Sequence, residues 1–356
     1  MKQACIVTYC SWNSFGSILQ TIGLKKTLES LGAESFVVKD TPAPTSTKKF
    51  NFVFSKSPRK LIKDFFLIRT RKKREVGYKN QVEFINDKVD IIYFNDYEVL
   101  KKNPPKADFY IAGSDQIWHP DLCKRLFFLD FVPKKEKCYS YSASMGKTEI
   151  SEDKKSTFSR LISRFDSISV RESQMENVIS EFVKDKVYQH IDPTFLLDKT
   201  AWESYEKEYV IDKPYILVFA IYWDKKLNKE LKKLHKKTGF EIVSICGGFS
   251  HVWATKKIYD ADCGNFLYLI HHAKAVVSSS FHGVALSINY NKKICAVVNP
   301  KLPSRLNSLL NLLGVKPTKI QNVLDFDLSE YEKINLTIEK EREKSFDYLK
   351  GIVNGK

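Results

Sequence analysis

Lys274-Ala-Val-Val-Ser-Ser-Ser-Phe-His282-Gly283-Val-Ala-Leu-Ser-Ile-Asn-Tyr290 changes from a strand pattern to a helix pattern within a few residues. Its apolar, β-branched beginning is typical of a buried strand, and Val284–Tyr290 is typical of the start of a helix. Backbone N–H groups at such a junction, together with the helix dipole, favour an anion. The imidazole of His282 adds a group that exchanges protons near neutral pH. The stretch therefore predicts an α/β unit with an anion site, and a packed histidine in an ordinary turn is the alternative.

A second apolar run ends in polar residues within Asp108-Phe-Tyr-Ile-Ala-Gly113-Ser114-Asp115-Gln116-Ile-Trp118. In open α/β sheets, ligands bind at the carboxyl ends of the strands. Asp115 can act as a base or orient a hydroxyl. Ser114 and Gln116 can hydrogen-bond sugar-like groups, and Trp118 can stack on an apolar ring face. A capped turn with a buried Trp118 fits the same residues.

Together these stretches resemble the polysaccharide pyruvyl transferase family, and further segments follow its pattern in the expected order. Asn13-Ser-Phe15-Gly16-Ser-Ile-Leu19-Gln20 is similar to the opening Asn-Gly loop and first helix of that family. Tyr141–Gly146, Ser169–Ser173 and Ile191–Thr194 are similar to its middle motifs, and Ser304–Gly314 is similar to its late Arg-containing segment. The resemblance extends from about Cys5 to Gly314.

Strand-like and helix-like segments alternate along the chain, which is the pattern of layered α/β proteins. The predicted strands are Ala4–Tyr9, Ser35–Val38, Ile91–Tyr93, Phe109–Ala112, Lys137–Ser142, Ser167–Arg171, a strand at Tyr188, Tyr215–Tyr222, Glu241–Ile245, Ala275–Ser279 and Ile294–Val298. The predicted helices are Ser17–Leu31, Lys154–Arg164, Ser173–Phe182, Trp202–Tyr209, Leu227–Thr238, Cys263–Ala273, Gly283–Asn291 and a long exposed helix over Glu330–Lys350.

Asp192-Pro193 interrupts this alternation and marks a domain boundary. The expected architecture is α/β, with two doubly wound Rossmann-like domains that face a cleft. Residues 1–200 form the domain on the acceptor side, 201–330 the domain on the donor side, and 331–356 a C-terminal helix. This is the GT-B arrangement, which is also the fold that the resemblance implies.

Size and composition fit a globular protein of two domains. The chain has 356 residues and 41.2 kDa, with 43% hydrophobic and 28% charged residues. Met1–Cys10 reads as a first strand rather than a secretory signal, and Tyr215–Trp223 is too short to span a membrane. Seven cysteines without a Cys-x-x-Cys pair indicate reduced thiols. These features predict a cytoplasmic protein.

The formal net charge of +16 raises the question of an anionic partner. No nucleic-acid-binding motif accompanies the charge, so no nucleic-acid partner is expected. The densest basic cluster lies within residues 56–74: Lys56, Arg59, Lys60, Lys63, Arg69, Arg71, Lys72, Lys73 and Arg74, interleaved with large apolar side chains. That mixture suits peripheral contact with an anionic membrane at its inner face, near lipid-linked glycans. An exposed basic helix packed on its own domain is the alternative.

The resemblance implies transfer of an enolpyruvyl unit from phosphoenolpyruvate onto two hydroxyls of one sugar, which leaves a cyclic ketal and phosphate. The acceptor implied is a surface or capsular polysaccharide precursor, and no cofactor is needed beyond this co-substrate. A donor with a carboxylate and a phosphate requires cations and backbone N–H groups. Its enol carbon must receive a proton from an acid of suitable pKa, and a base must take the hydroxyl proton.

These requirements assign roles to residues of the motifs. His282 is the predicted general acid, and Asp115 is the predicted base or acceptor-orienting group. The predicted donor-binding residues are Arg171, Lys274, Ser279, Ser280, Phe281, Gly283 and Arg305, and the predicted acceptor-binding residues are Asn13, Gly16, Ser114, Gln116 and Trp118. An ion pair with a neighbouring carboxylate is the structural alternative for Arg171.

One position departs from the family pattern. Many members carry Arg before the aromatic–His pair, where this chain has Ser280. Lys274, Arg171 or Arg305 could supply the cation instead, or the donor could differ.

The other histidines give no metal signature. His271 and His272 are adjacent and expected on different helix faces, so they form no i, i+4 pair. No metal is therefore predicted.

Two other functions stay open at this point. The first is a GT-B glycosyltransferase that uses a nucleotide sugar, with its diphosphate at the His282 turn. The second is a non-catalytic glycan- or nucleic-acid-binding protein that uses the basic surface.

Overall fold

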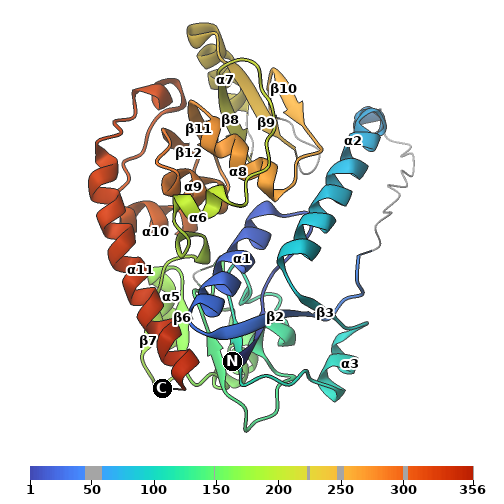
Figure 1. Ribbon diagram of the computed structural model, residues 1–356, viewed down its shortest axis with the longest axis vertical. Coiled ribbons are helices and arrows are strands. Elements are labelled where there is room, and N and C mark those ends of the chain that lie inside the picture. The colour runs from blue at the N-terminus through green and yellow to red at the C-terminus, as the bar shows by residue number, and fades with distance from the viewer. Residues whose placement is uncertain (45–57, 148, 223–224, 247–251, 300–303, 356) are drawn as a thin grey trace.

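Two parallel β-sheets, one from each half of the chain, form the framework of the protein (Figure 1). The computed structural model describes residues 1–44, 58–147, 149–222, 225–246, 252–299 and 304–355, without the side chains of residues 58–68 and 304. The strand order is β3-β2-β1-β4-β5 in the first sheet and β10-β9-β8-β11-β12 in the second. Both orders reverse beside the first strand of each half, which is the Rossmann arrangement. The predicted fold of two Rossmann-like domains is confirmed.

The first sheet and its helices form what we call the N-terminal lobe. Its strands are β1 (Lys2–Val7), β2 (Ala33–Lys39), β3 (Ile91–Tyr93), β4 (Phe109–Ala112) and β5 (Cys138–Ser140), and bridges to β6 (Ile168–Val170) and β7 (Val187–Gln189) continue the layer. Its helices are α1 (Phe15–Ser30), α2 (Pro58–Lys88), α3 (Tyr97–Lys102), α4 (Glu152–Ile162) and α5 (Ser173–Ser180), with the 3₁₀ turn η1 (Arg125–Phe128). The central strand β4 is buried at every position, because helices cover both faces of the sheet.

The second sheet belongs to the C-terminal lobe. Its strands are β8 (Tyr215–Phe219), β9 (Glu241–Ile245), β10 (Lys256–Ile258), β11 (Ala275–Ser278) and β12 (Ile294–Ala296). The helices around it are α6 (Lys199–Glu203), α7 (Lys225–Thr238), α8 (Cys263–His272), α9 (Phe281–Asn289), α10 (Ser304–Leu313) and α11 (Glu330–Asn354), with η2 (Pro193–Phe195) and η3 (Ile320–Asp325). The prediction of a helix over Trp202–Tyr209 is wrong, because the Asp198 side chain caps a helix that ends at Glu203.

A continuous apolar cluster joins the two lobes. Phe15, Ile18 and Ile22 of α1 belong to the same cluster as Phe266 and Ile270 of α8. The ring of Phe15 stacks on that of Phe266, with centroids 5.0 Å apart. The lobes are therefore packed against each other, and polar groups between them are removed from water.

The long helix α11 crosses from the C-terminal lobe back to the N-terminal lobe (Figure 1). Its Tyr348 hydroxyl donates to the carbonyl of Ser140, and Arg342 Nε donates to the carbonyl of Phe195. Ile338 and Leu349 are buried on its inner face. The expectation of an exposed helix is wrong, because charged residues cover only the outer face.

Two further expectations concern thiols and membranes. All seven cysteines are free thiols, as the sequence indicated. Among the described residues, no helix has the length and apolarity needed to cross a bilayer.

Candidate active site

The two sheets direct their strand ends toward a shared boundary between the lobes. Each sheet has a switch point where its strand order reverses, next to β1 and β4 in the first sheet and next to β8 and β11 in the second. Asn13 follows β1, Asp115 follows β4 and His282 follows β11. Ligands of doubly wound folds bind at such switch points. The predicted motifs therefore converge from both lobes.

His282 lies in the first turn of α9, between the lobes. Ser280 caps this helix, and its Oγ accepts from the Gly283 N–H at 3.5 Å. The helix thus starts earlier than the sequence predicted, and the cap occupies one of the amides expected for an anion. A Cβ atom placed on Gly16 of α1 would come within 2.2 Å of His282 Nδ1, so only glycine fits there. His282 is 6% exposed.

The other nitrogen of His282 faces an acidic side chain. His282 Nε2 lies 3.6 Å from Asp192 Oδ2, and it has no hydrogen-bond partner among the described residues. Burial alone would raise the pKa of Asp192, but the adjacent charges of His282 and Arg171 outweigh burial and hold it well below its ordinary value. Thr194 N–H and Oγ1 also donate to Asp192 Oδ1, at 3.0 and 2.8 Å. Asp192 is therefore a fixed carboxylate beside the imidazole.

Arg171 is buried between two carboxylates. Its Nε donates to Glu172 Oε1 at 2.9 Å and its Nη1 to Asp192 Oδ2 at 2.8 Å, so the ion pair that the sequence left open as an alternative is present. Burial would lower the pKa of Arg171, but Glu172 and Asp192 raise it above its ordinary value. The guanidinium carbon lies 3.9 Å from the centroid of the Phe281 ring. Its Nη2 has no hydrogen-bond partner within the described part of the chain.

A second arginine, Arg305 of α10, faces the same space. Its Nη1 lies 4.0 Å from Asp115 Oδ1, beyond hydrogen-bond distance. Burial lowers the pKa of Arg305, and the nearby Arg171 lowers it further. Arg171, Glu172, Asp192, Phe281 and Arg305 line one small pocket, which we call the charged pocket. Two guanidinium groups that crowd each other are stabilised by a bound anion.

Comparison with models of known protein families shows to which family the chain belongs. The model of the polysaccharide pyruvyl transferase family matches residues 15–300. The chain belongs to the polysaccharide pyruvyl transferase family.

Solved structures place this family member among proteins of the GT-B fold. A UDP-N-acetylglucosamine 2-epimerase aligns with a TM-score of 0.57 at 10% identity, over 94% of this chain and 90% of that chain. UGT89C1 of Arabidopsis thaliana, complexed with quercetin, aligns with a TM-score of 0.54 at 10% identity over 99% of both chains. UDP-GlcNAc 2-epimerase from Neisseria meningitidis, bound to UDP-GlcNAc, gives 0.50 at 13% identity over 96% of this chain and 94% of that chain. Identities this low show the fold alone. No curated protein matches the chain significantly in sequence.

Two of the predicted site residues lie away from His282 and the charged pocket. Trp118 is 0% exposed, stacks on Phe128 with centroids 5.8 Å apart and donates from Nε1 to the carbonyl of Phe127. It is a core residue, so its assignment to stacking on a sugar is wrong. Lys274 precedes β11, whereas the His282 turn follows that strand, so the two lie at opposite ends of the sheet. The assignment of Lys274 to donor binding is wrong for that reason.

The hydroxyls of the predicted turn support the backbone. Ser279 Oγ accepts from the Tyr222 N–H at 2.9 Å, and Ser114 Oγ donates to the carbonyl of Ser142 at 2.6 Å. Asn13 is exposed, and Gln116 is half-buried beside Gly146. Gly16, another predicted acceptor residue, lies close to His282.

Sequence reasoning missed Asp192 and Glu172 as site residues. Both stood inside motifs that were recognised, Ile191–Thr194 and Ser169–Ser173. Asp192-Pro193 was interpreted only as a boundary, although an aspartate in a segment that crosses between domains is close to both. Charge of opposite sign to a predicted arginine was the available signal.

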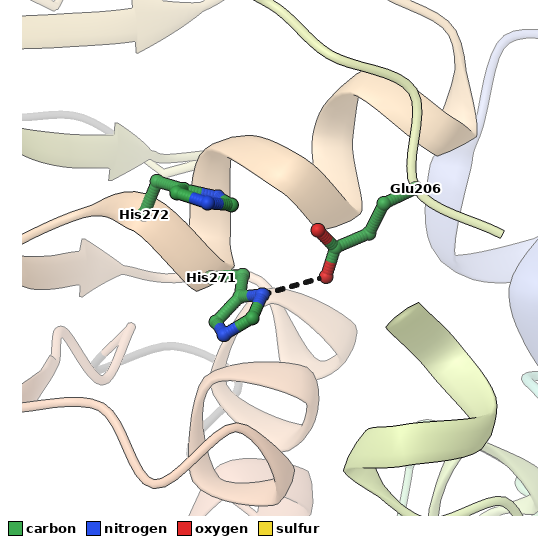
Figure 2. Close-up of side chains that lie close together, drawn as sticks. All are labelled: Glu206, His271 and His272. Carbon is green, nitrogen blue, oxygen red and sulfur yellow. Dashed lines mark hydrogen bonds and ion pairs between the residues drawn. The ribbon is translucent and has the colours of Figure 1, made fainter. Parts of the chain in front are cut away.

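A separate group of side chains lies at the end of α8 (Figure 2). Glu206, His271 and His272 place atoms that could hold a metal ion within 4.8 Å of one another. His271 Nδ1 lies 2.9 Å from Glu206 Oε1, and the two imidazole centroids are 4.8 Å apart, so the expectation that these rings diverge is wrong. The group precedes β11, at the end of the sheet away from His282. His272 Nδ1 already pairs with the carbonyl of Tyr268 at 3.0 Å.

Proposed function

We propose that this chain transfers the enolpyruvyl group of phosphoenolpyruvate onto a sugar of a surface or capsular polysaccharide precursor, with the charged pocket as the donor site. One observation carries the proposal. Arg171 and Asp192 of the N-terminal half line one pocket together with Arg305 of the C-terminal half. His282 lies 3.6 Å from Asp192, and Asp115 lies 4.0 Å from Arg305. A proton donor beside paired cations is what the donor chemistry requires.

The two arginines are suited to hold the phosphate and carboxylate of the donor. Arg171 Nη2 is buried without a partner, and Arg305 lies 4.0 Å from its nearest carboxylate. Each therefore has hydrogen-bonding capacity for an anion. Arg305 lines the same pocket as Phe281, so it can supply the cation that Ser280 does not. The free volume of the pocket is about 10 Å³, about the space of a single water molecule, so the donor enters only when the lobes move apart.

His282 is the proposed acid. Protonated His282 gives its proton to the methylene carbon of phosphoenolpyruvate, and positive charge develops at the carbon that carries the phosphate. Asp192 stabilises the imidazolium before transfer, from 3.6 Å. A sugar hydroxyl then attacks the cationic carbon, and Asp115 takes the hydroxyl proton. The C–O bond to phosphate then breaks, and the leaving phosphate takes the proton from Asp115. A second hydroxyl of the same sugar attacks the same carbon and gives its proton to His282, which closes the ketal and restores the acid.

Access to this site requires movement of the lobes. His282 is 6% exposed, and Gly16 and Asp192 of the N-terminal half cover its two ring nitrogens. We therefore expect substrates to bind while the lobes are apart and to react when they close, which excludes water from the cationic intermediate.

Membrane association belongs to the same proposal. Arg69, Lys72 and Lys73 of α2 are exposed, whereas Arg74 is buried, and the side chains of residues 56–68 lie outside the described part. The exposed cations can hold the enzyme beside lipid-linked acceptors on an anionic surface. Flotation with anionic liposomes tests this contact, and a charge-neutralised variant of residues 69–73 that binds equally well removes the idea.

The activity itself is tested by offering competing donors. The protein is incubated with lipid-linked glycans and either phosphoenolpyruvate or a panel of UDP-sugars. We expect phosphate release with phosphoenolpyruvate and a glycan whose mass rises by pyruvate minus water. Release of UDP and transfer of a sugar residue would instead identify a glycosyltransferase.

A further inference from the structure

A second pocket lies between the lobes, next to the start of α1. Trp12, Asn13, Arg74, Tyr78, Gln81 and Tyr259 are among its lining residues, and we call it the aromatic pocket. Its free volume is about 70 Å³, below the ~300–1,000 Å³ range of small-molecule sites, so a ligand the size of a sugar ring fits only when the lobes move apart.

Both lobes build this pocket through close contacts of α2. A Cβ atom on Gly77 would come within 2.4 Å of the carbonyl oxygen of Tyr259, and Asn80 Nδ2 donates to the carbonyl of Asp260 at 3.1 Å. The ring of Trp12 packs edge-on against Tyr78, with centroids 4.5 Å apart. Aromatic rings from both halves of the chain are thus held around one space.

Gln81 supplies an unsatisfied acceptor at the same place. Its Nε2 donates to Cys263 Sγ at 3.2 Å, but its buried Oε1 has no hydrogen-bond partner among the described residues. The residue is 3% exposed and lines the pocket. A buried carbonyl oxygen without a donor is costly, so a ligand that offers an O–H group to it is favoured.

The charges of the pocket favour an uncharged ligand. The lining cation is Arg74, whose guanidinium lies 4.6 Å from the centroid of the Tyr259 ring and whose Nε donates to Thr70 Oγ1 at 2.9 Å. It is therefore engaged by protein groups, in contrast to Arg171 with its unpartnered Nη2. Aromatic faces with an amide acceptor suit a pyranose ring, which has apolar C–H faces and a rim of hydroxyls.

We propose that the aromatic pocket binds a pyranose ring of the acceptor glycan, with Trp12 as the stacking residue and Gln81 Oε1 as a hydroxyl acceptor. The inference rests on the proposed function for the acceptor's identity. Asn13 and Phe15 line the pocket, and Gly16, one residue further, touches His282. A glycan seated there can extend past this turn toward the imidazole, so Trp12 and Gln81 act as positioning residues.

The test measures glycan binding without turnover. Saturation-transfer NMR with a panel of methyl pyranosides and disaccharides is applied to the full chain and to the variants Trp12→Ala and Gln81→Leu. We expect each variant to weaken binding about tenfold, while phosphoenolpyruvate binding is unchanged. Trp253→Phe, which alters a tryptophan that packs on His235, is the matched control and should bind like the parent.

The outcomes separate this inference from the proposed function. If the variants weaken glycan binding but no phosphoenolpyruvate turnover occurs, the aromatic pocket stands and the proposed donor is wrong. If turnover occurs and neither variant changes glycan binding or the KM for the acceptor, the inference is overturned. It is also overturned if UDP, rather than a pyranoside, binds in a way that Trp12→Ala abolishes. Gln81→Leu removes the unsatisfied oxygen, so it tests the pocket even if Trp12→Ala fails to fold.

Discussion

The charged pocket and the aromatic pocket both take residues from the two lobes, yet different kinds of side chain line them. Two arginines and two carboxylates line the first, whereas aromatic rings line the second beside Gln81, whose amide oxygen has no hydrogen-bond partner among the described residues. Gly16 follows Phe15 of the aromatic pocket, and it closely approaches His282, which follows Phe281 of the charged pocket. Under the proposed function, this difference in charge directs the anionic donor to the charged pocket and the neutral glycan to the aromatic pocket.

The largest expected effect comes from replacing His282. His282→Ala removes the proposed acid, and turnover should fall about a thousandfold, within the range for general acid catalysis. Glycan and phosphoenolpyruvate binding should persist, because neither pocket is lost. Steady-state phosphate release measures the change. The control is His272→Ala, at an exposed histidine away from the site, which should keep the parental rate. Full activity in His282→Ala would contradict the catalytic role of His282.

Asp192→Asn breaks the ionic framework of the charged pocket. It leaves Arg171 and His282 without their shared carboxylate, so we expect a loss of about 3 kcal/mol in the free energy of unfolding at pH 7. Because the pKa of Asp192 is depressed in the folded chain, its contribution is complete above the pKa of an unfolded aspartate, about 4, and fades as the pH falls further. Urea unfolding at several pH values checks this.

The stability difference between the parent and Asp192→Asn should therefore shrink on acidification below about pH 4. A difference that stays constant down to the lowest accessible pH would contradict the depressed pKa. Asp260→Asn changes an aspartate in the C-terminal lobe that pairs with the Tyr209 hydroxyl at 3.0 Å, and it serves as the comparison.

Arg305→Ala sharpens the assignment of the donor to the charged pocket. We expect the KM for phosphoenolpyruvate to rise about tenfold or more, because a charge-assisted hydrogen bond is lost. The KM for the glycan should not change. Initial-rate kinetics with each substrate varied in turn separates the two constants. Arg160→Ala, at an exposed arginine of α4, is the control for loss of positive charge alone.

Gly16→Ala tests the close approach of Gly16 to the His282 ring. The added Cβ meets the His282 ring at 2.2 Å, so the imidazole or the lobes must shift, at a cost of about 1–3 kcal/mol. Gly351→Ala in α11 adds a methyl group with nothing within 4 Å and should stabilise the protein slightly. Thermal unfolding of both variants gives the comparison. Equal behaviour would mean that Gly16 does not closely approach the imidazole.

Much of the fold could be predicted because its strands carry strong local signals. Ile91–Tyr93, Phe109–Ala112 and Glu241–Ile245 agree with β3, β4 and β9 at both ends. The strand β10 was missed, because Lys256–Ile258 is short and begins with two lysines. The burial of α11 was missed because mean composition hides a narrow apolar stripe among lysines and glutamates.

The site was predictable where a residue follows a strand and less so where distant contacts decide. His282, Asp115, Arg171 and Arg305 come together as the motifs indicated. Trp118 follows a strand equally well, but Phe128 and Phe165 enclose it, and no local pattern shows that. Asp192 is important through His282 of α9 and Arg171, which follows β6, and only the folded chain brings these partners near.

The most direct measurement is a crystal structure of the His282→Ala protein with phosphoenolpyruvate and a glycan fragment. The account predicts the phosphate and carboxylate beside Arg171 and Arg305, with the methylene group directed at the space left by the imidazole and the sugar ring against Trp12. Phosphoenolpyruvate bound elsewhere, or a nucleotide in the charged pocket, would contradict it.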